Sequence, residues 1–279
     1  MNRIDKTFAQ LRSRKEKALI PYIMAGDPYL ERTEELVLAM ERAGADIIEL
    51  GVPFSDPIAD GPVIQRAGQR ALKWKTGLKD ILRLVADIRK KSEIPMVLMT
   101  YYNPVLKFGI ETLFKEAAAC GVDGLIIPDL PPEEGQAVRD RSRRSGLNWI
   151  LLAAPTTPPD RLKLLSGRTQ GFLYYVSLTG ITGASLKNFS EVKARLSAIR
   201  RMTDKPIAVG FGVSTPDQAN ALAGMADGVI VGSAIVRLIE EHMDDSDLPA
   251  VIAAFVKQLK QAVAGGRTRR AAQSGVRHS

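Results

Sequence analysis

The feature that most restricts the fold of this sequence is a regular alternation of short apolar runs with amphipathic segments of helical spacing. Eight apolar runs of strand length are each followed by at least one helix-like segment, over short connections. Strands that alternate with helices in this way form a parallel sheet with right-handed crossovers. The predicted strands cover residues 18–25, 46–52, 95–102, 124–128, 149–154, 172–177, 206–209 and 228–231.

Eight such units within about 250 residues predict an α/β fold, a closed (β/α)8 or TIM barrel. A doubly wound open sheet is the alternative, but no Gly-x-Gly-x-x-Gly pattern follows the first predicted strand. We expect an extra N-terminal helix over residues 2–17 that closes one end of the barrel, and short extra helices after strands 2 and 8. One barrel domain is predicted over residues 1–264, and a disordered basic tail over residues 265–279. Functional groups should lie at the C-terminal ends of the strands.

Composition narrows the functional class. The net charge is +8, but Arg267, Arg269, Arg270 and Arg277 lie in a tail without acidic residues, so the body of the chain is close to neutral. We therefore expect no binding of nucleic acid. Cys120 is the single cysteine, which excludes an internal disulfide and a cysteine-based zinc site. The sequence shows no signal peptide and no apolar run long enough for a membrane span, so we expect a cytoplasmic protein without membrane contact.

Residues 46–62 contain the strongest candidates for catalysis. Glu49 interrupts the apolar second strand, and the loop that follows returns Asp60 over the same strand end. Alternation places Ile47 and Glu49 on one face and Ile48 and Leu50 on the other. Burial would raise the pKa of Glu49 while solvent keeps the pKa of Asp60 low, and two such carboxyl groups suit acid/base catalysis. The alternative is a glutamate on an edge strand beside a solvated loop.

Glycine clusters end the last two strands. Strand 7 ends in Gly210-Phe211-Gly212, and strand 8 ends in Gly232-Ser233, where a short helix opens. Backbone N–H groups at a helix N-terminus, next to glycines that allow close approach, bind phosphate at this place in many barrels. The pattern predicts a phosphate site. The alternative is that these glycines only form tight turns.

Further candidates lie at or near the strand ends. Apolar side chains at these places could line a ligand cavity. The candidates are Tyr22, Met99, Tyr101, Ile126, Tyr174 and Phe211. We expect about half of them to contact a ligand, since aromatic side chains on strands often belong to the core. Asp129 also ends a strand, where it would serve a binding loop or cap a helix. The Gly- and Thr-rich residues 178–187 fit a mobile lid after strand 6.

Other chemistries are disfavoured. His242 and His278, the only histidines, lie in a predicted helix and in the tail, so neither a catalytic triad nor a histidine-bound metal site is expected. Lys205 precedes its strand, which argues against a Schiff base. What remains is acid/base catalysis by carboxyl groups on a phosphorylated substrate with an apolar part.

Two runs in residues 49–62 carry a family resemblance. Glu-Leu-Gly-Val-Pro-Phe-Ser-Asp-Pro at residues 49–57 and Asp-Gly-Pro at residues 60–62 resemble the signature of the tryptophan synthase α subunit family, and the similarity covers residues 8–259. The resemblance implies a lyase of tryptophan, and hence aromatic amino-acid, biosynthesis. Such an enzyme cleaves indole-3-glycerol phosphate to indole and D-glyceraldehyde 3-phosphate by a retro-aldol reaction without a cofactor. It also implies a partner β subunit that carries pyridoxal phosphate, in an α2β2 heterotetramer.

The resemblance extends to single residues. It implies that Thr182 helps to position the catalytic carboxyl groups and that Asp129 lies at a binding loop, while Leu178 replaces an arginine that some members carry in the lid. The positions that match phosphate contacts of the family are Gly183, Gly212, Gly232 and Ser233. We expect Glu49 to transfer protons at indole C3 and the glyceryl hydroxyl, with Asp60 on the indole N–H. Two alternatives stay open, namely another phosphate-binding barrel enzyme, such as an isomerase or aldol-type lyase, and a non-catalytic barrel that activates a partner.

Overall fold

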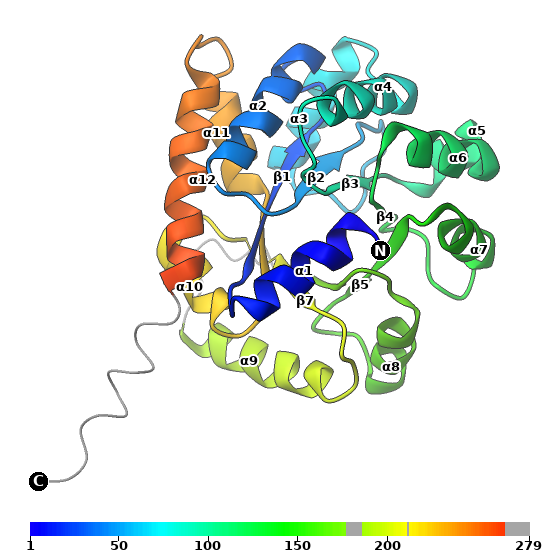
Figure 1. Ribbon diagram of the computed structural model, residues 1–279, viewed down its shortest axis with the longest axis vertical. Coiled ribbons are helices and arrows are strands. Elements are labelled where there is room, and N and C mark those ends of the chain that lie inside the picture. The colour runs from blue at the N-terminus through cyan, green and yellow to red at the C-terminus, as the bar shows by residue number, and fades with distance from the viewer. Residues whose placement is uncertain (177–185, 211, 266–279) are drawn as a thin grey trace, which may run out of the picture.

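The strands form a closed barrel, as predicted. The computed structural model describes residues 1–176, 186–210 and 212–265 (Figure 1). Within these residues each strand pairs in parallel with the next one, and the last pairs with the first. An open sheet is thereby excluded. The strands are β1 (Ala18–Met24), β2 (Ile48–Gly51), β3 (Met96–Met99), β4 (Gly124–Ile126), β5 (Asn148–Ala153), β6 (Leu173–Val176), β7 (Ile207–Gly210) and β8 (Gly228–Val231).

Helices surround this barrel, with α1 in the centre of the view and the others around it (Figure 1). The predicted extra helices are present, as α1 before β1, α3 after β2 and α11 after β8. The helices are α1 (Arg3–Ser13), α2 (Leu30–Arg42), α3 (Pro62–Lys73), α4 (Leu78–Arg89), α5 (Tyr102–Phe108), α6 (Ile110–Cys120), α7 (Gln136–Ser145), α8 (Pro159–Arg168), α9 (Leu186–Arg200), α10 (Pro216–Ala223), α11 (Ser233–Glu241) and α12 (Leu248–Gly265). Residues 266–279 of the predicted tail lie outside the described residues.

One local prediction was wrong. The predicted third strand continued to residue 102, whereas β3 ends at Met99 and a short helix, α5, begins at Tyr102. The carboxylate of Asp129 accepts a hydrogen bond from the backbone N–H of Tyr102 at 2.9 Å, which satisfies one free donor in the first turn of α5. A contact with a residue so distant in the chain leaves no trace in local spacing.

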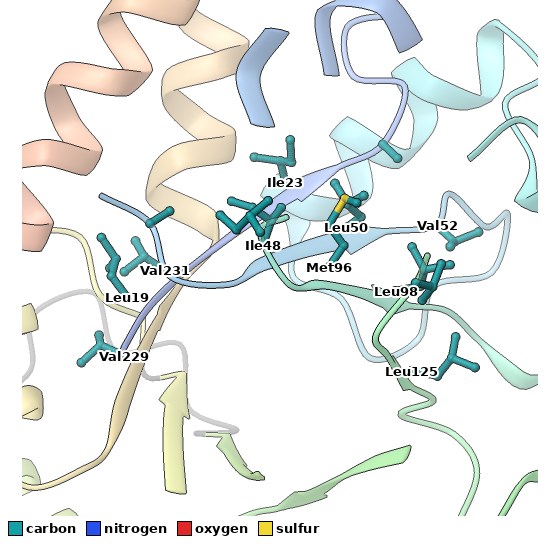
Figure 2. Close-up of a cluster of buried hydrophobic side chains, with 14 of the residues drawn as sticks. Leu19, Ile23, Ile48, Leu50, Val52, Met96, Leu98, Leu125, Val229 and Val231 are labelled. Carbon is teal, nitrogen blue, oxygen red and sulfur yellow. The ribbon is translucent and has the colours of Figure 1, made fainter. Parts of the chain in front are cut away.

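Side-chain alternation divides the core in two. Inside the barrel, Ile20, Ile47 and Val97 pack together with Ile4 and Phe8 of α1, which closes the end where the strands begin. Outward-facing side chains pack against the surrounding helices, and Figure 2 shows part of this layer; among them are Leu19, Ile48, Leu50, Leu98 and Val229. The predicted faces of β2 are therefore confirmed, because Ile47 points inward and Ile48 points outward. Burial of both layers supplies the main driving force for folding.

One contact recurs four times at the N-terminal rim of the barrel. Just before each even-numbered strand, a side-chain oxygen accepts a hydrogen bond from the backbone N–H of a residue near the start of the preceding odd-numbered strand. The pairs are Asp46 with Leu19 at 2.7 Å, Asp123 with Met96 at 2.9 Å, Gln170 with Trp149 at 2.9 Å and Asp227 with Ile207 at 2.9 Å. The three aspartates also pair with Lys260, Arg89 and Arg200 respectively. These contacts fasten neighbouring strands together at the end of the barrel opposite the cavity described next.

Candidate active site

A cavity of about 720 Å³ lies at the C-terminal ends of the strands, where the barrel fold predicts functional groups. Side chains and backbone from every strand or its following loop border it; they are Tyr22, Glu49, Ile58, Ala59, Asp60, Gly61, Ile64, Met99, Pro128, Leu152, Ala153, Ala154, Thr157, Tyr174, Val176, Gly210, Gly212, Val213, Ile230, Gly232 and Ser233. Both predicted carboxyl groups therefore share one cavity. Another cavity, of about 610 Å³, lies beside α1 at the opposite end, but its Arg3 is already paired with Glu93 and Asp123.

Glu49 lies deep in the cavity and is 1% exposed. The strand that carries it, β2, is hydrogen-bonded to β1 on one side and β3 on the other, so it is not an edge strand. Neither carboxyl oxygen of Glu49 has a hydrogen-bond partner among the described residues. Burial, with a smaller contribution from the charge of Asp60, raises its pKa to about 8. Glu49 is therefore mostly protonated at pH 7 and can act as an acid.

Asp60 borders the same cavity from the loop between β2 and α3. Its side chain is only half-buried, yet burial raises its pKa to about 6, against the lowering effect of a hydrogen bond with Tyr101. The expectation that solvent would keep this pKa low was wrong, because the loop folds back over the cavity. The pKa of Asp60 still lies below that of Glu49. At pH 7 the cavity thus holds one protonated and one ionised carboxyl group.

Tyr101 and Asp129 were predicted to contact substrate, but neither borders the cavity. Tyr101 lies buried behind the Asp60 loop, where its hydroxyl accepts a hydrogen bond from the backbone N–H of Ala59 at 2.9 Å and its ring stacks on Phe54 with centroids 5.2 Å apart. Asp129 is exposed, and its carboxylate accepts the backbone N–H of Tyr102 at the start of α5, so its contact with substrate stays a prediction. Ile126 belongs to the interior core. Tyr101 therefore supports the loop that carries Asp60.

Tyr22 and Tyr174 form aromatic walls on the cavity and are both almost fully buried. Burial and the nearby carboxyl groups raise the pKa of each well above its ordinary value, so both hydroxyls stay protonated. Strand glycines make room for the rings. A Cβ at Gly51 would lie 2.1 Å from the Tyr22 hydroxyl oxygen, and a Cβ at Gly210 would lie 2.7 Å from the Tyr174 ring. These glycines are therefore required by the shape of the cavity.

The predicted phosphate-binding residues lie at another part of this cavity. Gly212, Gly232 and Ser233 all border it, and Ser233 is the first residue of α11. The backbone N–H groups in the first turn of a helix have no partner within the helix, and the helix dipole adds partial positive charge there. Gly212 has a φ of 55°, a left-handed conformation that favours glycine. Phe211 and residues 178–185 of the predicted lid, which include Thr182 and Gly183, lie outside the described residues.

Sequence reasoning did not select seven further residues that border the cavity. They are the apolar residues Ile58, Ile64, Leu152, Val176, Val213 and Ile230, and the hydroxyl residue Thr157. Leu152 could have been selected from the sequence, since it lies near the end of a predicted strand. In the structure it packs against the interior core. Among the described residues, no group of three or more His, Cys, Asp or Glu side chains could hold a metal ion. Within that part of the chain, no helix has the length and apolar character of a membrane span.

Comparison with known proteins gives one family. A family model described as tryptophan synthase alpha chain matches residues 8–264. The chain is 47% identical to the tryptophan synthase alpha chain of Geotalea daltonii over 264 residues, which cover 95% of this chain and 100% of the relative. The relative from Gloeobacter violaceus is 48% identical over 261 residues, covering 93% of this chain and 94% of the relative.

Solved structures agree with these matches. The crystal structure of tryptophan synthase subunit alpha from Legionella pneumophila superposes with a TM-score of 0.89 at 41% identity, covering 94% of this chain and 98% of the other. A chain in the open form of tryptophan synthase from M. tuberculosis superposes with a TM-score of 0.85 at 34% identity, covering 95% and 99%. Because the matches cover nearly the full length and agree with the barrel and the paired carboxyl groups, the chain belongs to the tryptophan synthase alpha chain family.

Proposed function

We propose that this chain cleaves indole-3-glycerol phosphate to indole and D-glyceraldehyde 3-phosphate, with Glu49 and Asp60 as its catalytic residues. The α reaction is that of the family, and it makes the chain a carbon–carbon lyase of tryptophan biosynthesis. The observation that carries the residue assignment is the pair of carboxyl groups in one cavity, with pKa values of about 8 and about 6. The sequence left two alternatives open, another barrel enzyme and a non-catalytic barrel. The family match favours the α reaction over both.

The first step is a proton transfer to the ring. Protonated Glu49 gives its proton to C3 of the indole, which leaves the positive charge on the ring nitrogen. The carboxylate of Asp60 accepts a hydrogen bond from the indole N–H and stabilises that charge. Because Glu49 is almost fully buried and Asp60 is half-buried, their electrostatic effect is stronger than it would be in solvent.

The second step breaks the carbon–carbon bond. Ionised Glu49 takes the proton from the hydroxyl on the glyceryl carbon attached to C3, and that oxygen forms a carbonyl. The electron pair of the broken bond returns to the ring, which restores neutral indole and releases D-glyceraldehyde 3-phosphate. The net proton count of Glu49 is unchanged after one turnover. A positioned proton-transfer group of this kind contributes about 100- to 10,000-fold in rate.

The phosphate of the substrate would bind at the first turn of α11. The backbone N–H groups beyond Gly232 and the hydroxyl of Ser233 would donate to the phosphate, and Gly212, which also borders the cavity, would leave room for its approach. Apolar walls that include Tyr22, Leu152 and Tyr174 suit the indole ring. By family likeness, Gly183 would add a phosphate contact and Thr182 would help to position the catalytic carboxyl groups.

No cofactor takes part in the reaction. The described residues that line the cavity include no lysine, so they offer no amine for a Schiff base. The family name implies a partner, the β subunit, and we infer that pyridoxal phosphate is held there within an α2β2 heterotetramer. Ile58 and Leu106, in the segments that follow β2 and β3, are 83% and 51% exposed and would meet that partner. The cytoplasmic location expected from the sequence stays a prediction.

One assay tests the function. The chain is incubated with indole-3-glycerol phosphate, and indole is detected by chromatography. Wild type should form indole in proportion to enzyme and time, and Glu49→Gln should not do so at a measurable steady rate. A folded wild type that forms no indole, with or without the β subunit, would contradict the proposal. Indole formation by Glu49→Gln near the wild-type rate would contradict only the residue assignment.

A further inference from the structure

A network of ion pairs joins two helices that begin at the cavity. Arg70 of α3 donates to both carboxylate oxygens of Asp27, from Nε at 2.7 Å and Nη2 at 2.8 Å. Its third nitrogen, Nη1, donates to Glu240 of α11 at 2.6 Å. Asp27, in the loop after β1, is 1% exposed. Arg66 adds two hydrogen bonds to Glu240, at 2.8 and 2.7 Å. One guanidinium thus connects β1, α3 and α11.

Both helices lead directly to the proposed catalytic and phosphate groups. Helix α3 begins at Pro62, two residues after Asp60, and Arg70 lies about two turns further along it. Helix α11 begins at Ser233, and Glu240 likewise lies about two turns from that end. An α-helix is rigid over such a length, so the separation fixed at Arg70 and Glu240 also governs the separation of the two N-terminal ends.

Apolar packing beside the network brings the same elements together. Ile64, Ala67 and Ala71 of α3 pack with Val236 of α11 and with Tyr22 of β1, which itself borders the cavity. The small side chains on α3 let the helices approach closely. They also leave few interlocking contacts to resist sliding, so directional hydrogen bonds are needed to set the register of one helix against the other.

The geometry requires arginine rather than any cation. The planar guanidinium presents its donors in a fixed fork, and here two of them match one carboxylate while a third reaches another. A lysine ammonium would keep the charge but could not hold both carboxylates in these directions. Arg70→Lys therefore tests the geometry of the guanidinium alone, because it keeps the positive charge.

We propose that Arg70 is a positioning residue for the α reaction, which holds Asp27 and Glu240 together and so fixes Asp60 relative to the phosphate-binding turn of α11. The inference rests on the proposed function. Substrate is anchored by its phosphate at one helix end, and its ring must meet Asp60 at the other. Because catalysis depends steeply on such placement, a small change in the separation lowers the rate of the chemical step.

The test is a double-mutant cycle with Arg70→Lys and Asp60→Asn. The rate of indole formation is measured at steady state over a range of substrate concentrations for wild type, both single variants and the double variant, on protein shown to be folded by circular dichroism. We expect Arg70→Lys to lower kcat at least fivefold with KM within threefold of wild type. In the Asp60→Asn background it should lower the rate less than twofold, because the group it positions is gone.

A merely structural role would give a different result. An equal loss in both backgrounds, or a loss smaller than fivefold in the wild-type background, overturns the proposal. Glu240→Gln is the second variant, since it weakens the link to α11 while the fork on Asp27 remains, and it should show the same pattern. Glu133→Gln is the matched control: its partner Arg161 makes a similar fork, at 2.7 and 3.2 Å, away from the cavity, and kcat should stay unchanged. If wild type forms no indole, the proposed function fails before the cycle begins.

Discussion

The hydroxyl of Tyr101 holds Asp60 over the cavity from behind. It accepts the backbone N–H of Ala59 at 2.9 Å, and its hydrogen bond with the Asp60 carboxylate lowers the pKa of that group. Half-burial raises the same pKa more strongly, so the value of about 6 is the balance of two opposing effects. The acidity of Asp60 therefore depends on a residue that does not touch the cavity.

Removing this hydroxyl should change both rate and pH dependence. In Tyr101→Phe the pKa of Asp60 rises, because the hydrogen bond to its ionised form is lost. We expect kcat/KM at pH 7 to fall about tenfold and the free energy of unfolding to fall by about 1 kcal/mol. Steady-state kinetics and urea unfolding measure the two effects. Tyr102→Phe, on the next residue, is the control, and equal losses in both variants would refute a specific role for Tyr101.

The pH dependence of kcat/KM should be bell-shaped. Below about pH 6 Asp60 takes up a proton and no longer stabilises the cationic ring, and above about pH 8 Glu49 loses the proton that it must donate. Activity is therefore highest between these values. Rates of indole formation from pH 5 to pH 9 measure the curve. A profile that is flat from pH 5 to pH 7 would contradict the role of ionised Asp60.

Glu49→Gln should abolish activity but not the fold. We expect a loss of about 100- to 10,000-fold in kcat, because one group serves both proton transfers. The buried carboxyl also makes stability depend on pH. Its pKa is about 8 in the folded chain against an ordinary 4.5, so the folded state disfavours ionisation, and wild type loses stability as pH rises from about 4.5 to 8.

The glutamine variant lacks this pH effect. At pH 8.5 it should be more stable than wild type by several kcal/mol, at about 1.4 kcal/mol for each pKa unit, and near pH 4 the difference should vanish. Urea unfolding of both proteins at the two pH values measures it. Parallel stability curves for the two proteins would show that Glu49 is not desolvated in solution.

Gly212→Asp should weaken phosphate binding. Aspartate tolerates left-handed backbone angles better than most residues, so the φ of 55° should not prevent folding. Its carboxylate would repel a phosphate in a partly dehydrated cavity. We expect at least about a tenfold loss of affinity for glycerol 3-phosphate by calorimetry. Gly167→Asp is the control. It adds the same charge on α8, where a side chain would meet no other atom, and the affinity of this variant for glycerol 3-phosphate should equal that of wild type.

The β subunit should activate the chain. We infer that the loop that carries Asp60 becomes more ordered when the partner binds, and that the binding energy offsets the cost of that ordering. We expect saturating β subunit to raise turnover at least about tenfold. Leu106→Asp, outside the cavity, should reduce this activation while the basal rate stays the same. Unchanged turnover in a complex confirmed by sedimentation would contradict this role for the partner.

Spacing and composition predicted the barrel because each strand and helix carries its own periodic signal. The bounds of β8 agree with the prediction, since a glycine and an apolar run mark them locally. Glu49 could be identified because a carboxyl group within an apolar strand is unusual. The hydrogen bonds of Tyr101 with Ala59 and of Asp129 with Tyr102 could not be predicted, because nearness to a strand end does not fix where a side chain points.

The Arg70 network also lay beyond the reach of sequence reasoning. Its partners Asp27 and Glu240 are separated from Arg70 by 43 and 170 positions in the chain. A charged residue on a predicted helix is ordinarily expected to lie on the face exposed to solvent. Only the closure of the barrel, which brings the last helices beside the first strand, turns these three charges into one contact.

The four side-chain contacts at the N-terminal rim have a consequence for how such an enzyme can change over time. They fasten β1 to β2, β3 to β4, β5 to β6 and β7 to β8 without using any residue of the cavity. Substitutions and insertions in the loops at the other end therefore leave these fastenings intact. During evolution, changes in those loops can therefore alter which substrate is bound while the barrel still closes.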